Sequence, residues 1–145
     1  MKIKNEFRSY IFGTYIVAID TENRITLPHQ LKKAFGEITY TIIYESKDLI
    51  KIYFPQTIDY MAEHFLKEED NEESKLEFFS KGRIVPLETK NVKGDYSRIR
   101  LTEITHKDLA ERLELAEDES LKVTLLGNGD HLLLDKRKII KFKNK

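Results

Sequence analysis

The order of apolar and polar residues predicts a first series of short elements between residues 13 and 66. β-Branched and aromatic residues favour strands, and three polar residues between two such runs indicate a tight loop. Pro28 suits the first turn of a helix, because the N–H that proline lacks would be unpaired there. The predicted order is strand, strand, helix, strand, strand, helix, over residues 13–20, 24–27, 28–36, 38–44, 49–54 and 55–66.

A second series repeats much of this order toward the C-terminus. It predicts a strand, a helix, a hairpin and a short basic helix or tail, over residues 98–101, 105–113, 121–126, 131–135 and 136–142. Thr105 and Asp108 have the spacing of an N-cap pair at the start of the helix. Arg24 and Arg98 begin matching strands in the two series. This repetition predicts an internal duplication.

The duplication predicts two halves, residues 12–66 and 83–142, joined by an acidic helical connection over residues 67–82. Each half has only a few short strands, which are marginal as an independent sheet. We therefore expect the strands of one half to complete the sheet of the other. Residues 82–86 are a second candidate for the start of the second copy. Arg98 is preferred, because the helix and the hairpin follow it at the right distances.

The formal net charge is zero, with 25 Lys and Arg residues against 25 Asp and Glu residues in a chain of 145. This balance excludes a protein that binds nucleic acid through overall basic character. The charges are uneven, however: residues 1–36 hold six basic and three acidic residues, residues 81–107 hold seven and three, and residues 68–73 are an acidic run. The two basic segments are either patches on the folded surface or fluctuations ordinary in a highly charged chain.

No signature of catalysis, metal binding or cofactor binding stands out. The chain has no cysteine, which excludes a disulfide framework, a thiolate nucleophile and a thiolate metal ligand. Its four histidines lack metal-site spacing, and there is no glycine-rich phosphate-binding loop. No apolar run reaches the roughly 20 residues of a membrane span. We expect a cytoplasmic protein that is not an enzyme, has no membrane partner and uses no metal or cofactor.

The loop from Asp20 to Arg24 carries the clearest local chemistry. A carboxylate at a strand end can cap loop amides, and an arginine four residues later can fold back onto it or point outward from the loop tip. The first geometry is a structural ion pair, and the second is a fixed positive prong. The spacing alone leaves both open.

The same residues resemble a known family. Residues 13–20, the spacing Asp20-x-x-x-Arg24 and the run Ile25-x-Leu27-Pro28 look like the first motif of MraZ, a family of bacterial transcription regulators with two fused SpoVT/AbrB-like halves. Residues 126–136 resemble the end of that family's second half. The resemblance implies a β-rich α+β fold: a double-psi or swapped-hairpin AbrB-like barrel formed by two pseudo-symmetric halves with short helices.

The second copy departs from the family pattern. Gly94 stands four residues before Arg98, where the family has aspartate, and Asp95 stands three before it. Thr102 replaces the family's proline, and Leu134 stands where the family usually has tryptophan. The second loop is therefore expected to differ from the first.

For function, the resemblance implies a nucleoid-associated homo-oligomer that binds repeated sites on double-stranded DNA and regulates division and cell-wall genes. DNA affinity depends mainly on neutralising phosphates, so basic loops repeated in an oligomer can offset a zero net charge. The competing hypothesis is a homo-oligomeric interaction or antitoxin-like module of the same fold that has lost DNA binding. The residues expected to bind DNA are Arg24, Lys32, Lys33, Lys93, Arg98 and Arg100, and those expected to shape the loops are Asp20, Asn23 and Asp95.

Overall fold

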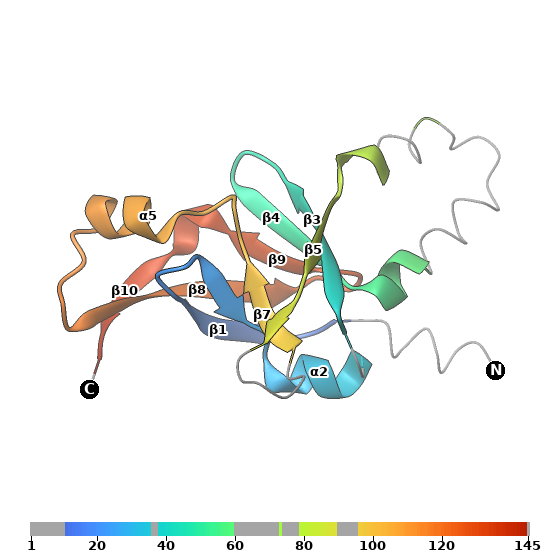
Figure 1. Ribbon diagram of the computed structural model, residues 1–145, viewed down its shortest axis with the longest axis horizontal. Coiled ribbons are helices and arrows are strands. Elements are labelled where there is room, and N and C mark those ends of the chain that lie inside the picture. Colours follow the sequence, from blue (N-terminus) through green and yellow to red (C-terminus); the bar gives the residue numbers. More distant parts are fainter. Residues whose placement is uncertain (1–10, 36–37, 60–72, 74–78, 90–95, 145) are drawn as a thin grey trace.

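The computed structural model describes residues 11–35, 38–59, 73, 79–89 and 96–144 (Figure 1). The strands in this part of the chain are β1 (Thr14–Ile19), β2 (Arg24–Thr26), β3 (Tyr40–Glu45), β4 (Leu49–Tyr53), β5 (Arg83–Pro86), β6 (Glu88–Thr89), β7 (Tyr96–Arg100), β8 (Glu119–Gly127), β9 (Leu132–Asp135) and β10 (Ile140–Lys143). Its helices include α2 (His29–Phe35), α5 (His106–Arg112) and the 3-10 helix η2 (Lys136–Lys138). No helix among these residues is long and apolar enough to cross a bilayer.

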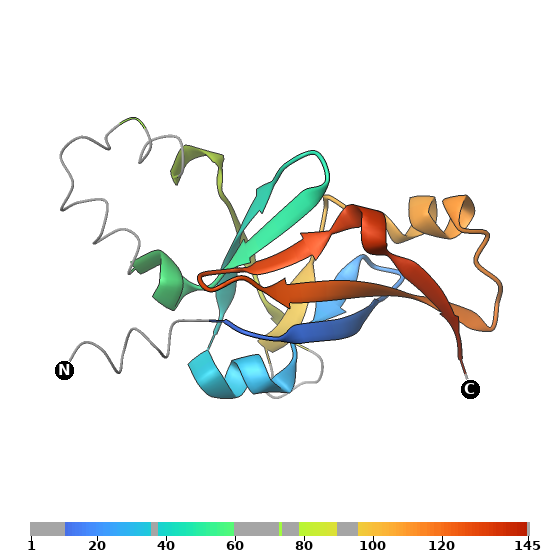
Figure 2. The same cartoon turned by 180° about the vertical axis from the view of Figure 1, so that it is seen from behind.

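The strands form one antiparallel sheet that curls into a nearly closed barrel (Figures 1 and 2). Along the sheet the order is β5-β3-β4-β9-β8-β1-β2-β7-β6, and β10 adds to β8. The two ends of this order, β5 and β6, are consecutive in the chain. Residues 83–89 therefore pair with β3 on one side and with β7 on the other, which brings the sheet back on itself.

Strands from the two sequence series are interleaved around the barrel. β1 pairs with β8, and β5, at the start of the second half, pairs with β3, so the first strand of each half lies beside a hairpin strand of the other half. The second strands, β2 and β7, pair with each other, as do β4 and β9. Two backbone hydrogen bonds repeat this relation, from Leu27 N to Ser97 O at 2.7 Å and from Leu101 N to Asn23 O at 2.8 Å. The interior is thus shared by both series.

Alternating residues of the strands fill the barrel interior. In β8, Leu121, Val123 and Leu125 are fully buried, as expected for a strand with one face on a core. Ile25 of β2 lies opposite Ile99 of β7, and both are fully buried. The residues on either side of these two isoleucines therefore point to the outside of the barrel.

Two features differ from the sequence prediction. Residues 83–86 form strand β5, which we had not assigned as a strand of the second copy, and β5 completes the barrel by pairing with β3. Residues 136–142 were expected to form a basic helix or tail, but only η2 is helical, and β10 then pairs with β8. Lys122 of β8 stabilises β10 by placing its ammonium 3.8 Å from the centre of the Phe142 ring.

The N-terminus of α5 is capped differently from the prediction. Thr105 occupies the N-cap position, but its side chain makes no capping hydrogen bond. The backbone N–H of His106 donates instead to Oδ1 of Asn23 at 2.6 Å, so a loop of the first half caps a helix of the second. The acidic connection expected over residues 67–82 lies mostly outside the described residues.

Candidate nucleic-acid interface

The loop between β1 and β2 is fixed by its first residue. Asp20 Oδ1 accepts hydrogen bonds from the backbone N–H groups of Glu22 and Arg24, both at 2.9 Å. Asn23 adopts a φ of 65°, in the left-handed region that asparagine tolerates better than most residues. Its N–H donates to the Asp20 carbonyl at 3.0 Å. Asp20 and Asn23 together hold the loop in one shape.

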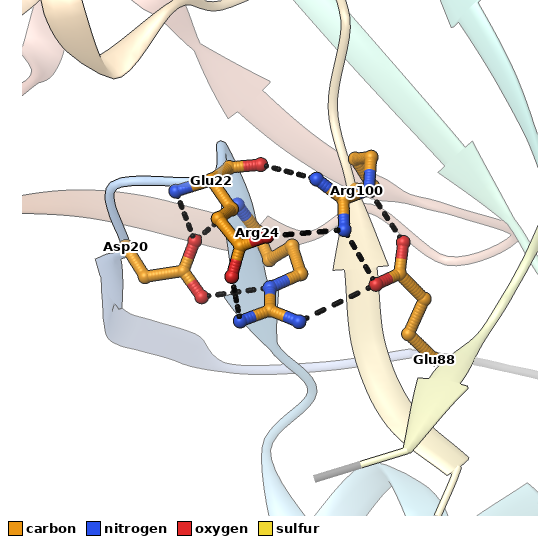
Figure 3. A network of polar contacts seen from close by, with 5 residues as sticks. All are labelled: Asp20, Glu22, Arg24, Glu88 and Arg100. Atoms are coloured by element: carbon orange, nitrogen blue, oxygen red, sulfur yellow. Dashed lines mark hydrogen bonds and ion pairs between the residues drawn. The ribbon is translucent and has the colours of Figure 1, made fainter.

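Arg24 folds back onto this loop instead of pointing outward (Figure 3). Its Nε donates to Asp20 Oδ2 at 2.9 Å, and one Nη donates to Glu22 at 2.9 Å. The other Nη reaches Glu88 at 3.4 Å. With only 16% of its side chain exposed, Arg24 has every guanidinium nitrogen bound to a carboxylate.

Partial burial acts to raise the pKa of Asp20, but it is outweighed. The backbone and side chain of Arg24 and the backbone of Glu22 donate hydrogen bonds to the carboxylate, so its pKa lies below the ordinary value. The Asp20 bond is in turn the main cause that raises the pKa of Arg24. The pair is therefore charged throughout the neutral range.

Arg100 and Glu88 extend the contact into the second half. Arg100 donates from Nε and Nη2 to the two oxygens of Glu88, at 2.6 and 2.8 Å, and from Nη1 to the backbone carbonyl of Glu22 at 2.9 Å. The Arg100 hydrogen bond is the main cause that lowers the pKa of Glu88, and it exceeds the opposing effect of burial. We call Asp20, Glu22, Arg24, Glu88 and Arg100 the charge cluster (Figure 3).

Glu88 holds in the second copy the place that Asp20 holds in the first. Asp20 follows the end of β1, and its backbone N–H donates to the carbonyl of Arg24. In the same way, Glu88 lies directly opposite Arg98 where β6 pairs with β7. We had looked for this carboxylate at Asp95, three residues before Arg98. The carboxylate is that of Glu88, ten residues before Arg98, because the loop of the second copy is longer. A strand at residues 83–86 followed by Leu87 and Glu88 is the sequence signal that indicates it.

The three arginines expected to bind DNA lie on one face of the barrel. Arg24 is opposite Arg100, and Thr26 is opposite Arg98. Directly opposed residues share a face of a sheet, as do residues two apart in a strand. The intervening Ile25 and Ile99 point into the core. We call Arg24, Thr26, Arg98 and Arg100 the arginine face.

The structure locates only part of the remaining predicted site. Lys32 is partly buried on α2, which follows β2 directly after Pro28. The side chain of Lys33, and Lys93 and Asp95 entirely, lie outside the described residues, so their roles stay predictions. Sequence reasoning missed Glu22 and Glu88 as partners of the arginines. Glu22 lies only two residues before Arg24 and was open to local analysis, whereas Glu88 is 64 residues from Arg24 and no local spacing indicates it.

This arrangement suits contact with an anion more than bond-making chemistry. Guanidinium groups on a sheet face donate hydrogen bonds in pairs to phosphate or carboxylate oxygens. Within the described part of the chain, no group of three or more histidine, aspartate or glutamate residues is placed to hold a metal ion. The carboxylates of the charge cluster are instead occupied by arginine.

No model of a known protein family matches this sequence, and no curated protein matches it. The functional assignment therefore depends on the charge cluster, the arginine face and the resemblance carried by residues 13–28 and 126–136.

Proposed function

We propose that this chain is a MraZ-like DNA-binding transcriptional regulator, not an enzyme, that acts as a homo-oligomer on repeated DNA sites. By resemblance, those sites belong to division and cell-wall genes. The observation that carries the proposal is the arginine face, where arginines from both halves share one outer surface. A DNA interface requires its positive side chains to lie on one outer surface, because a single duplex must be reached from that surface.

The strand pairing supports a swapped-hairpin, AbrB-like fold for each half. In such a fold, two copies of one unit exchange strands and build a single barrel. The pairs β1 with β8 and β5 with β3 have the reciprocal form that this exchange requires, and the pairing of β2 with β7 brings the two arginine motifs together.

Self-association follows from the charges of a single copy. The charge cluster contains three carboxylates and two guanidinium groups, and Arg98 brings the region only to neutrality. One copy therefore gives little net attraction to phosphates, whereas several copies on repeated sites add their contacts. We expect sedimentation at micromolar concentration to show species heavier than the monomer, and a purely monomeric protein would contradict this part of the proposal.

One observation favours the competing function, a homo-oligomeric interaction or antitoxin-like module without DNA binding. All guanidinium nitrogens of Arg24 and Arg100 already have acceptors within the chain. A phosphate would have to replace Glu22 or Glu88 to reach either arginine, and the nearby carboxylates repel it.

Selection of genomic fragments separates the two functions. The full-length protein is incubated with sheared genomic DNA of its source at low and at near-physiological salt, and bound fragments are sequenced. A regulator should enrich fragments with short repeats upstream of genes, with an affinity that falls steeply as salt rises. A protein that self-associates but enriches no fragment at either salt would be the interaction module.

A further inference from the structure

The three arginines of the arginine face differ in their bonding. Arg24 and Arg100 each donate from all of their guanidinium nitrogens to acceptors within the chain. The Nε of Arg98 is buried and has no hydrogen-bond partner, and no ion pair joins Arg98 to another residue of the described structure. Arg98 is therefore the only arginine of this face whose guanidinium is uncommitted.

The charge cluster explains why Arg98 lacks a partner. Glu88 lies opposite Arg98 in the sheet and is the counterpart of Asp20, which binds Arg24. Glu88 turns instead to Arg100, with which it forms two hydrogen bonds, and to Arg24. The first copy of the motif thus has a closed ion pair, whereas the second has an open guanidinium.

An uncommitted and partly desolvated guanidinium is a costly group in an isolated protein. A buried N–H without an acceptor loses the hydrogen bond that it would make in water, and such groups are rare in folded proteins. The Nη groups of Arg98 take part in no hydrogen bond or ion pair of the described structure, so an anion from solvent can bind them without breaking an existing bond. At Arg24, the same anion would first have to displace a carboxylate.

Thr26 completes the surroundings of Arg98. It lies directly opposite Arg98 on β2, so the two Cβ atoms are about 5 Å apart. A hydroxyl beside a guanidinium offers two kinds of donor to neighbouring oxygens of one phosphate. We propose that Arg98, assisted by Thr26, makes the contact to a DNA backbone phosphate, whereas Arg24 and Arg100 hold the surface in shape. This inference rests on the proposed function. It assigns the phosphate contact to the second copy of the motif and a structural role to the first.

Binding and stability measurements on the full-length protein test this division. Fluorescence anisotropy is measured over a salt series with a duplex from the genomic selection and with a shuffled duplex. Arg98→Ala should weaken binding to both duplexes about tenfold to a hundredfold, as for a charge-assisted hydrogen bond, and reduce the salt slope by about one for each copy bound. Its urea unfolding midpoint should not fall below that of the wild type, because the change breaks no internal hydrogen bond and removes a buried donor that has no acceptor.

The other variants separate a phosphate contact from a structural role. Arg24→Ala should lower the urea midpoint and, where it remains folded at low temperature, bind within about threefold of wild type, because its bonds are internal. Thr26→Val should weaken binding less than Arg98→Ala does. Arg112→Ala removes an exposed arginine at the far end of α5 and is the matched control, with binding expected within about twofold of wild type.

Each unexpected binding result leads to a different conclusion. Wild-type protein that binds neither duplex overturns the proposed function and this inference with it. Wild-type protein that binds, with Arg98→Ala binding equally well, overturns the inference alone. If Arg98→Ala weakens only the selected duplex, Arg98 reads a base edge and the phosphate assignment is wrong.

Discussion

Asn23 should stabilise the fold through two separable contributions, which a short series of variants can resolve. Its backbone has a φ of 65°, which costs most residues with a Cβ roughly 1 kcal/mol or more, whereas glycine and asparagine adopt it at a much smaller cost. Its side-chain Oδ1 accepts the hydrogen bond from His106 N at 2.6 Å. Loss of a helix cap costs about 1 kcal/mol.

The magnitudes follow from these two contributions. Asn23→Ala loses the cap and strains the backbone, so it should lower the free energy of unfolding by about 2 kcal/mol. Asn23→Gly loses only the cap and should cost about 1 kcal/mol. Asn23→Asp keeps an acceptor at the start of α5 and should lie closer to wild type, because the favourable helix dipole partly offsets repulsion from Asp20 and Glu22.

Urea unfolding followed by circular dichroism measures all three variants. With a slope of about 2 kcal/mol per molar urea, Asn23→Ala should lower the midpoint by about 1 M. Equal midpoints for Asn23→Ala and Asn23→Gly would refute the backbone contribution. A wild-type midpoint for Asn23→Gly would show that the bond from His106 to Asn23 does not couple the two halves.

Three further predictions follow from local features. Glu114 has a φ of 54° just after the end of α5, where glycine is favoured, so Glu114→Gly should raise the free energy of unfolding by up to about 1 kcal/mol in the same urea assay. Arg137 hydrogen bonds to Asp135 and lowers the pKa of that carboxyl to about 2. A carboxyl whose pKa is lowered by folding stabilises the protein at pH values above its ordinary pKa. This contribution to the free energy of unfolding should therefore disappear as the pH falls from about 4 to 2. Thermal melts over that range should show a shallower loss for Asp135→Asn than for the control Asp108→Asn, and equal slopes would contradict it. A fragment of residues 1–80 lacks β5, β7, β8 and β9, the partners of its own strands, so it should be unfolded or strand-exchanged by gel filtration and circular dichroism, and a monomer that melts cooperatively would refute a shared core.

Local pattern was sufficient for most of the elements. The alternation of side chains in strands and the position of Pro28 are properties of neighbouring residues, so β1 to β4, α2, α5, β8 and β9 could be predicted from their own sequence. The charge motif from Asp20 to Arg24 was also visible, because an aspartate at a strand end captures the amides of the next few residues whatever the rest of the chain does.

Tertiary structure decided where the arginines point and which carboxylates hold them. Glu88 meets Arg24 and Arg100 only because β2, β7 and residues 83–89 become neighbours in the barrel, across 64 positions of sequence in the case of Arg24. The capping of α5 by Asn23 has the same origin. Such contacts depend on strand pairing between distant segments, which the whole core selects through burial, and no spacing within either segment encodes them.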